Sequence, residues 1–317
     1  MATPSTGVNP TNEKLYEQLV DALNALFGVH PGFRATHAKG VICDGTFTPS
    51  PSAASVSRAK HFQGEPTPVT VRFSDFTGIP NIPDTDPNAS PRGMAMKFHV
   101  AGGPDTDIVA HSFNGFPVGT AEEFLEFLLA VGSSGEAAPK PTPIEKFLST
   151  RPRALLFATS PKPAPASFTT QSYFAANAFR FTDDYGNSIF ARYQIRPLQG
   201  DAYLSDAETS AKPPNYLFDE ISERLAKGPA KLNLLAQLAA VGDVTGDCSV
   251  TWPDDRHLVE LGVITLTSVA AESDALQRKL IFDPANLIDG IGMSDDPLPA
   301  ARSAVYSIAY ARRNAKG

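Results

Sequence analysis

Apolar residues recur at helical spacing in several parts of the chain, separated by stretches with other patterns. In the first of these segments, leucines recur every three or four residues and a glycine follows the last one. A period of about 3.6 residues predicts a helix with one apolar face. The predicted helices cover residues 13–27, 120–131, 217–228 and 300–313.

Other segments alternate between apolar and polar residues, as half-buried strands do. In VTVRFSDF at 69–76, Val69, Val71 and Phe73 lie on one face, and threonine, arginine and serine at 70, 72 and 74 lie on the other. Further strands are predicted at residues 94–100, 178–195 (two strands around a turn), 249–253 and 258–269. Strands therefore cluster in two blocks, with helices between and after them. This order favours an α+β fold built on an antiparallel sheet or barrel.

Two proline-rich stretches interrupt the regular patterns. They are SSGEAAPKPTP at 133–143 and SPKPAPAS at 160–167. We interpret both as loops over one core, because strands with similar patterns lie on either side of them. The chain is therefore predicted to be a single domain over 1–317, with a flexible tail at 1–11.

Composition narrows the class of protein. Of the 317 residues, 42% are hydrophobic, which is ordinary for a soluble globular protein. The net charge of −7 argues against a general nucleic-acid binder, because the sequence supplies no long basic surface for phosphates. No run of about 18 apolar residues predicts a membrane span, and no secretory signal pattern opens the sequence. The two cysteines, Cys43 and Cys248, form no CxxC pair, which fits a reducing compartment. A cytoplasmic location is expected.

Common catalytic motifs are missing from the sequence. It contains no GxGxxG, Walker loop, HExxH or GxSxG motif. The six histidines are too widely spaced for a local metal motif, so any such site has to be assembled through space.

The last predicted helix carries a more specific pattern. Arg302, Tyr306 and Arg313 share one face of it. A guanidinium beside a phenol favours the phenolate, which is a hard anionic ligand suited to ferric iron. The alternative is a surface helix with solvated arginines and a tyrosine in the core.

Seven segments, taken in order, resemble those of the haem catalases. They are THAKG with Arg34, VRFSD at 71–75, RGMAMKF at 92–98, TDIVAHS at 106–112, WPDD at 252–255, FDPANLIDGIGMSDDPL at 282–298 and RSAVYSIAYARR at 302–313. The chain is short for a catalase, so it is most similar to the small catalase-related peroxidases. This resemblance covers residues 34–313 and implies an antiparallel β-barrel of about eight strands with flanking helices.

The resemblance also implies a haem b cofactor and the residues that bind it. Tyr306 matches the proximal iron ligand, and tyrosine ligation in catalase is an established pattern. Arg302 would hold Tyr306 as a phenolate. Arg34, Arg72 and Arg313 match positions that bind the haem propionates.

On the opposite side of the haem, the resemblance assigns a set of catalytic residues. His37 matches the distal histidine, which moves a proton between the two peroxide oxygens. Ser74 matches a serine that orients this histidine. Thr36 stands where true catalases usually have valine, and its hydroxyl can bond the peroxide or the histidine. The position of the distal asparagine in catalases matches His111 here, or Ser112 if the alignment shifts by one residue. Asn114 is a further candidate for the role of that asparagine.

Thr36 and His111 both differ from the residues that true catalases have at these positions. These two differences favour reduction of hydrogen peroxide or organic hydroperoxides by an external small-molecule electron donor, with weak catalase activity at most. A role in oxidative stress follows. Two alternatives stay open: a hydroperoxide isomerase or lyase of the allene oxide synthase type, which Thr36 permits, and a haem-binding carrier with negligible turnover. The expected partners are a peroxide and the donor, and a homodimer is left open.

Overall fold

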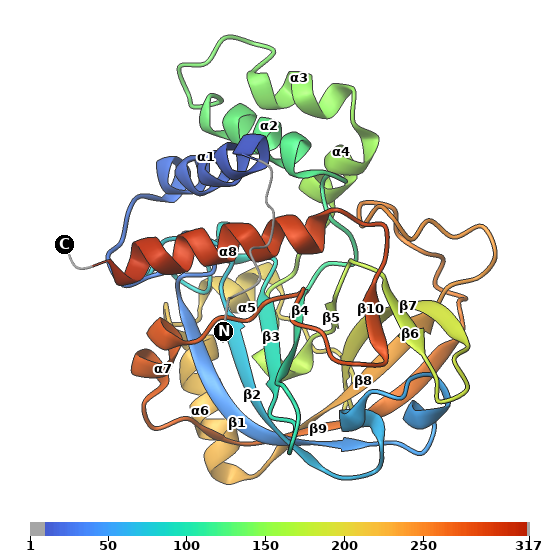
Figure 1. Ribbon diagram of the computed structural model, residues 1–317. Coiled ribbons are helices and arrows are strands. Elements are labelled where there is room, and N and C mark those ends of the chain that lie inside the picture. Colours follow the sequence, from blue (N-terminus) through green and yellow to red (C-terminus); the bar gives the residue numbers. More distant parts are fainter. Residues whose placement is uncertain (1–9, 316–317) are drawn as a thin grey trace.

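The computed structural model describes residues 10–315, which form ten strands and eight α-helices (Figure 1). The strands are β1 (Gly40–Pro49), β2 (Thr67–Ser74), β3 (Gly93–Phe98), β4 (Thr106–His111), β5 (Tyr173–Phe174), β6 (Phe179–Thr182), β7 (Ser188–Pro197), β8 (Ala230–Leu238), β9 (Leu258–Val269) and β10 (Ile291–Met293). The helices are α1 (Pro10–Phe27), α2 (Ala121–Gly132), α3 (Pro143–Ser149), α4 (Pro152–Thr159), α5 (Asp206–Ser210), α6 (Tyr216–Lys227), α7 (Ser273–Lys279) and α8 (Leu298–Asn314).

Eight of the strands close into an antiparallel barrel. Their order around it is β1-β2-β3-β4-β5-β7-β8-β9, and β9 pairs with β1 to complete the ring. Strands β6 and β10 extend the sheet from β7. The predicted class, an α+β fold on a barrel of about eight strands with flanking helices, is confirmed.

Side chains fill the barrel because alternate positions of each strand point inward. On β2, Val69, Val71 and Phe73 are buried in the main core, as their spacing predicts. The other face of β2 is buried only toward its C-terminal end, where Arg72 is 4% exposed. The end of α7 covers it, and a hydrogen bond joins the Arg72 and Gln277 side chains.

A layer of helices lies against one side of the barrel. In Figure 1, α8 runs across the ends of several strands, and α1 and α2 lie beyond it. A second apolar cluster holds these three helices together, with members that include Leu23 of α1, Leu128 of α2 and Leu298 of α8. The space between this layer and the barrel contains the site described below.

Some local predictions need correction. Residues 249–253 form no strand; instead the Trp252 indole N–H donates to the Val244 carbonyl oxygen, and the Arg192 guanidinium stacks on its ring. The first helix begins at Pro10, inside the expected tail, and residues 1–9 lie outside the described residues. The stretch after residue 142 forms α3, because Thr142 and Glu145 make a capping box.

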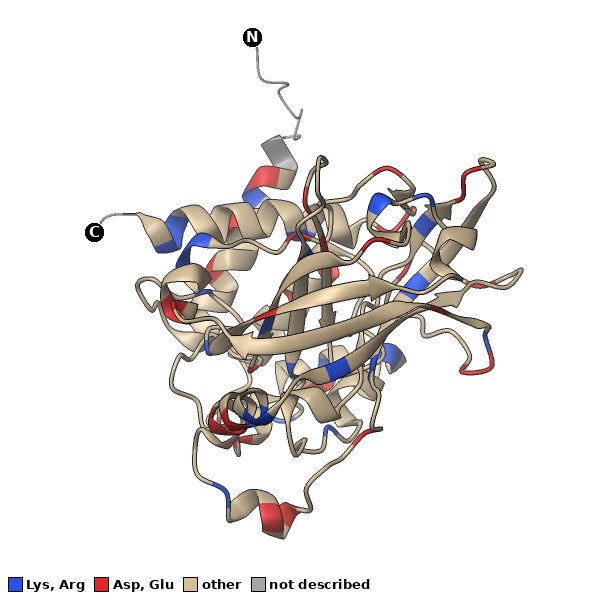
Figure 2. Ribbon diagram, turned by 90° about the horizontal axis from the view of Figure 1, so that it is seen from below, with Lys and Arg blue, Asp and Glu red and all other residues tan. Residues whose placement is uncertain are grey.

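Charged residues are distributed over the whole molecule. Figure 2 shows Lys and Arg positions interspersed with Asp and Glu positions on the helices, strands and loops. Among residues 10–315, none of the helices combines the length and apolar character that crossing a bilayer requires.

Candidate functional site

A cavity of about 1100 Å³ lies between the helix layer and the barrel. Helices α1, α2 and α8 form its walls on one side, and β2, β3 and β4 form them on the other. Nine of the candidate residues from the sequence line it: Arg34, Thr36, His37, Arg72, Ser74, His111, Arg302, Tyr306 and Arg313. The fold therefore gathers into one cavity residues that are up to about 280 positions apart, although their individual roles stay predictions.

On α8, a chain of hydrogen bonds ends at the Tyr306 phenol. Nε and one terminal nitrogen of Arg302 donate to the Tyr306 oxygen at 3.1 and 2.9 Å. The other terminal nitrogen of Arg302 donates to Asn177 Oδ1 at 2.9 Å, and Asn177 Nδ2 donates to Asp296 Oδ2 at 2.8 Å. Burial disfavours the Arg302 charge, but Tyr306, Cys248 and Asp296 together outweigh this effect, and the pKa of Arg302 is raised. The Tyr306 oxygen therefore accepts two N–H groups from one guanidinium, whose own position is fixed by Asn177.

Asn177 and Asp296 were missed in the sequence. Asn177 precedes β6 in a segment without any recognised motif. Asp296 lies within the FDPANLIDGIGMSDDPL segment, so its neighbourhood was identified but its contact was not. Both side chains are buried.

A group of three arginines lies at one edge of the cavity. Arg34 and Arg313 both donate to the Leu280 carbonyl oxygen, at 2.9 and 2.8 Å, so their guanidinium groups converge. Burial, together with repulsion from Arg72 and Arg313, lowers the pKa of Arg34, and burial with repulsion from Arg313 lowers that of Arg72 to about 9. Within residues 10–315, none of the three makes an ion pair with a carboxylate. Such a partly buried cationic cluster fits an incoming group that carries carboxylates.

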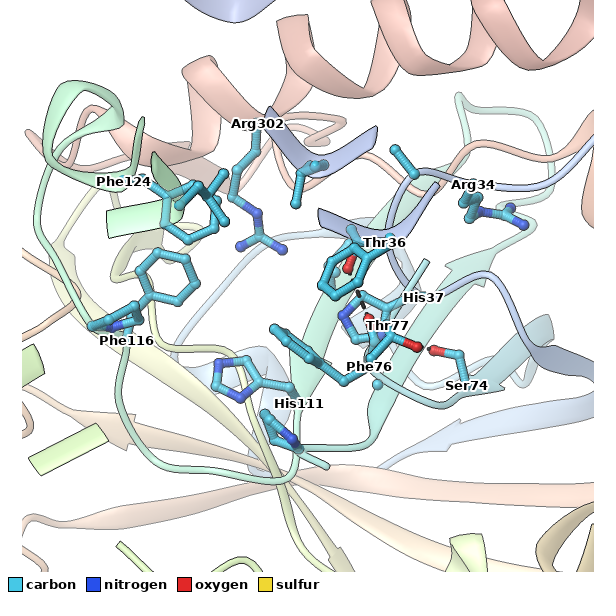
Figure 3. Close-up of a pocket in the computed structure, with 18 of the residues that line it drawn as sticks. Arg34, Thr36, His37, Ser74, Phe76, Thr77, His111, Phe116, Phe124 and Arg302 are labelled. Atoms are coloured by element: carbon cyan, nitrogen blue, oxygen red, sulfur yellow. Dashed lines mark hydrogen bonds between the residues drawn. The ribbon is translucent and has the colours of Figure 1, made fainter. Parts of the chain in front are cut away.

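His37 is held in a strained backbone conformation. Its φ of 55° is positive, which is otherwise confined to glycine among the described residues. The His37 main-chain N–H donates to the Phe76 carbonyl oxygen at 2.8 Å, and Nδ1 lies 3.1 Å from Ser74 Oγ (Figure 3). A Cβ atom at Gly93 would lie 2.7 Å from Nδ1, so only glycine leaves room for the ring. Burial, and then the nearby Arg72 charge, lower the pKa of His37 to about 3.

The Thr36 hydroxyl does not make the hydrogen bond to the histidine that the sequence suggested as one possibility. The hydroxyl donates to the Phe76 carbonyl oxygen at 2.8 Å and is not bonded to the His37 ring. The hydroxyl proton is therefore occupied, and the lone pairs of the oxygen remain to accept a hydrogen bond.

His111 lies at the end of β4, directly opposite Gly93 in the β-ladder. Both of its ring nitrogens are buried without a hydrogen-bond partner in the described part of the chain. Burial, reinforced by the charges of Arg302 and Lys162, lowers its pKa to about 3. Of the other candidates for this position, Ser112 accepts a hydrogen bond from the Arg92 N–H, and Asn114 does not line the cavity. In Figure 3, His111 and Phe116 lie on one side of Phe76 and His37 on the other.

These residues fit a haem. The arginine cluster suits its two propionates, the Tyr306 oxygen suits its iron, and apolar side chains from α1 and α8 line the intervening cavity walls. The cavity volume agrees with a large cofactor, since it lies slightly above the range of about 300–1,000 Å³ for small-molecule pockets.

Comparison with known proteins gives a consistent result. The family model described as "Catalase" matches residues 31–316. The chain is 35% identical to "Catalase-related peroxidase" of Mycolicibacterium paratuberculosis, over 92% of each chain. It is 32% identical to "Catalase-related peroxidase" of Synechococcus elongatus, over 98% of this chain and 90% of that one.

Solved structures show the same fold. One described as "Structure of a bacterial catalase" matches with a TM-score of 0.78 at 22% identity. The match covers 99% of this chain and 63% of the other, so the described fold corresponds to part of that longer protein.

Proposed function

The chain belongs to the catalase family, and from this membership we propose that it is a haem b-dependent peroxidase which reduces hydrogen peroxide or organic hydroperoxides with an external small-molecule donor. The observation that carries the proposal is the pairing of two groups on one cavity. Tyr306 offers an oxygen stabilised by two Arg302 N–H groups, and His37 offers an imidazole whose lowered pKa keeps it neutral near pH 7.

Several side chains of this protein would hold the cofactor. The Tyr306 oxygen would bind the iron, and Arg34, Arg72 and Arg313 would bind the propionates. When bound, haem supplies the iron centre at which the peroxide O–O bond is reduced. Asp296 and Asn177 fix the orientation of Arg302, which directs two N–H groups at the Tyr306 oxygen.

His37 would perform the proton transfer. The contact between Nδ1 and Ser74 Oγ fixes the ring orientation and leaves Nε2 for the peroxide. Because the imidazole is neutral, Nε2 can accept the proton from one peroxide oxygen and donate it to the other as the O–O bond breaks. The strained backbone at His37 is consistent with a position selected for chemistry.

Thr36 and His111 favour peroxidase turnover over disproportionation of hydrogen peroxide. Disproportionation requires the site to oxidise a second peroxide in a defined position. In this protein the Thr36 hydroxyl replaces a valine and the His111 imidazole replaces an amide, so different groups would hold the second peroxide. Thr36 is also the observation that favours the second candidate, an isomerase of the allene oxide synthase type.

The test is to mix the haem-loaded protein with hydrogen peroxide and with a fatty-acid hydroperoxide, with and without a phenolic donor. A peroxidase reduces the fatty-acid hydroperoxide to the alcohol and water, and hydrogen peroxide to water, and it oxidises the donor in proportion. An allene oxide or its hydrolysis products, formed without use of the donor, would support the isomerase. No spectral change with either peroxide would indicate a carrier and overturn the proposal.

A further inference from the structure

The cavity continues beyond the residues assigned so far, toward the C-terminal end of α4. Phe116, Phe157, Ala158, Ser160 and Lys162 line this part, which we term the α4 arm. The arm is continuous with the site, since the ring of Phe116 lies 6.4 Å from that of His111 and 6.5 Å from that of Phe157. Figure 3 shows Phe116 beside His111. The cavity therefore has an apolar extension next to the catalytic groups.

Lys162 is the charged group of the α4 arm. Its ammonium donates to the carbonyl oxygens of Phe157 and Ser160, at 2.5 and 3.1 Å. It also lies 4.8 Å from the Phe113 ring centre and 4.9 Å from that of Phe157. An ammonium has three N–H groups, so these two carbonyls leave one for a ligand.

Stabilisation of the α4 C-terminus explains part of this arrangement, because a lysine there satisfies free carbonyl groups. It does not explain why the lysine is half-buried on a cavity wall between two aromatic rings. Burial lowers the pKa of Lys162, and no carboxylate pairs with it in residues 10–315, although the chain has an excess of acidic residues. An anion entering the cavity would compensate for this lost hydration.

We propose that the α4 arm binds the carboxylate end of an amphipathic organic hydroperoxide, with Lys162 as the anion-binding group and Phe116 and Phe157 in contact with the apolar chain. The inference rests on the proposed function, since it defines the substrate class of the same site. Lys162 and His111 line the same cavity, so a carboxylate bound at Lys162 lies in one continuous space with the catalytic groups. Hydrogen peroxide has neither a carboxylate nor an apolar chain, and its turnover does not depend on this lysine.

The experiment compares three substrates on the haem-loaded protein: linoleic acid hydroperoxide, its methyl ester and hydrogen peroxide. Lys162→Met removes the charge and keeps an unbranched apolar side chain. Lys227→Met is the matched control, because Lys227 is a surface lysine of α6 whose side chain is 80% exposed. We expect Lys162→Met to raise KM for the acid about tenfold, the equivalent of about 1.4 kcal/mol, and to leave KM for the ester and for hydrogen peroxide unchanged.

A binding measurement separates this inference from the proposed function. Calorimetric titration with linoleic acid, which has no peroxide group, requires no turnover. We expect the wild type and Lys162→Arg to bind the acid more tightly than its methyl ester, and Lys162→Met to lose this preference. If the protein prefers linoleic acid to its methyl ester but turns over no peroxide, the proposed peroxidase function is refuted and carboxylate binding in the α4 arm is not. Equal binding of acid and ester by the wild type, or loss of the preference in Lys162→Arg as well, would overturn the arm.

Discussion

His61 provides a quantitative test of how the barrel core responds to pH. The side chain is 1% exposed, and its ring centre lies 4.0 Å from that of Phe62 and 4.5 Å from that of Phe98. Its Nδ1 atom has no hydrogen-bond partner in the described residues. Burial lowers the pKa of His61 to about 3, against 6.5 in the unfolded chain. The folded protein therefore keeps this ring neutral at pH values at which the unfolded chain takes up a proton.

This difference makes stability depend on pH in a defined window. As the pH falls from 6.5 toward 3, the unfolded chain binds more protons at His61 than the folded protein does, so the free energy of unfolding decreases. The slope is about 1.4 kcal/mol per pH unit, which amounts to about 2 kcal/mol at pH 5. Above pH 6.5 both states are neutral at this position, and the contribution no longer changes.

Replacement by leucine removes the titrating group and keeps a similar volume. We expect the difference in unfolding free energy between His61→Leu and wild type to shift by about 2 kcal/mol in favour of the variant between pH 7.5 and pH 5. Urea unfolding followed by far-ultraviolet circular dichroism measures it at both pH values. The other histidines are common to both proteins and cancel. The exposed His257→Gln substitution should show no such shift. A difference for His61→Leu that is independent of pH would refute the reasoning.

Four further predictions concern the cavity. Tyr306→Phe should lose haem or alter its ferric spectrum, and Arg302→Ala should show a milder change because the phenol remains; an unchanged spectrum at full occupancy would exclude Tyr306 as the ligand. His37→Ala should retain haem and react with peroxide about 10²–10⁴-fold more slowly in rapid-mixing experiments, and a wild-type rate would transfer the proton-transfer role to another group. Thr36→Val should increase oxygen release relative to oxidation of a phenolic donor, measured with an oxygen electrode and by absorbance; an unchanged ratio would show that the hydroxyl has no such effect. Gly93→Ala should slow the peroxide reaction, because its Cβ displaces the His37 ring, whereas Gly135→Ala, at a position with open space, should not.

The sequence was sufficient to predict the fold class and the residues that line the cavity. It succeeded where a local periodicity or a segment similar to the catalases was present. Alternation along β2 predicted its core face, and the spacing of Arg302 and Tyr306 predicted their contact. By contrast, the hydrogen bonds from Arg302 to Asn177 and from Asn177 to Asp296 join separate loops to α8, and no local periodicity encodes such contacts.

Other features depend on tertiary contacts in the same way. The positive φ of His37 is set by packing against Gly93 and by its bond to Phe76, whereas histidine alone does not favour it. Residues 249–253 have strand-like composition, but Trp252 is buried through contacts with Arg192 and Val244 and not through a β-ladder. In both cases a neighbour distant in the sequence determines the local structure.

Closure of the barrel by β1 and β9 has a consequence for how the chain folds. These strands are the first and the last long strands of the barrel, and Phe47 of β1 pairs with Ile264 of β9 across roughly 200 intervening residues. During synthesis, β1 can pair with β2 early, but its other edge stays free until β9 has been made. Contacts of such long range slow folding, and a free strand edge promotes aggregation. Nascent chains that stop between β8 and β9 therefore expose two free strand edges, one on β1 and one on β8, that only β9 covers.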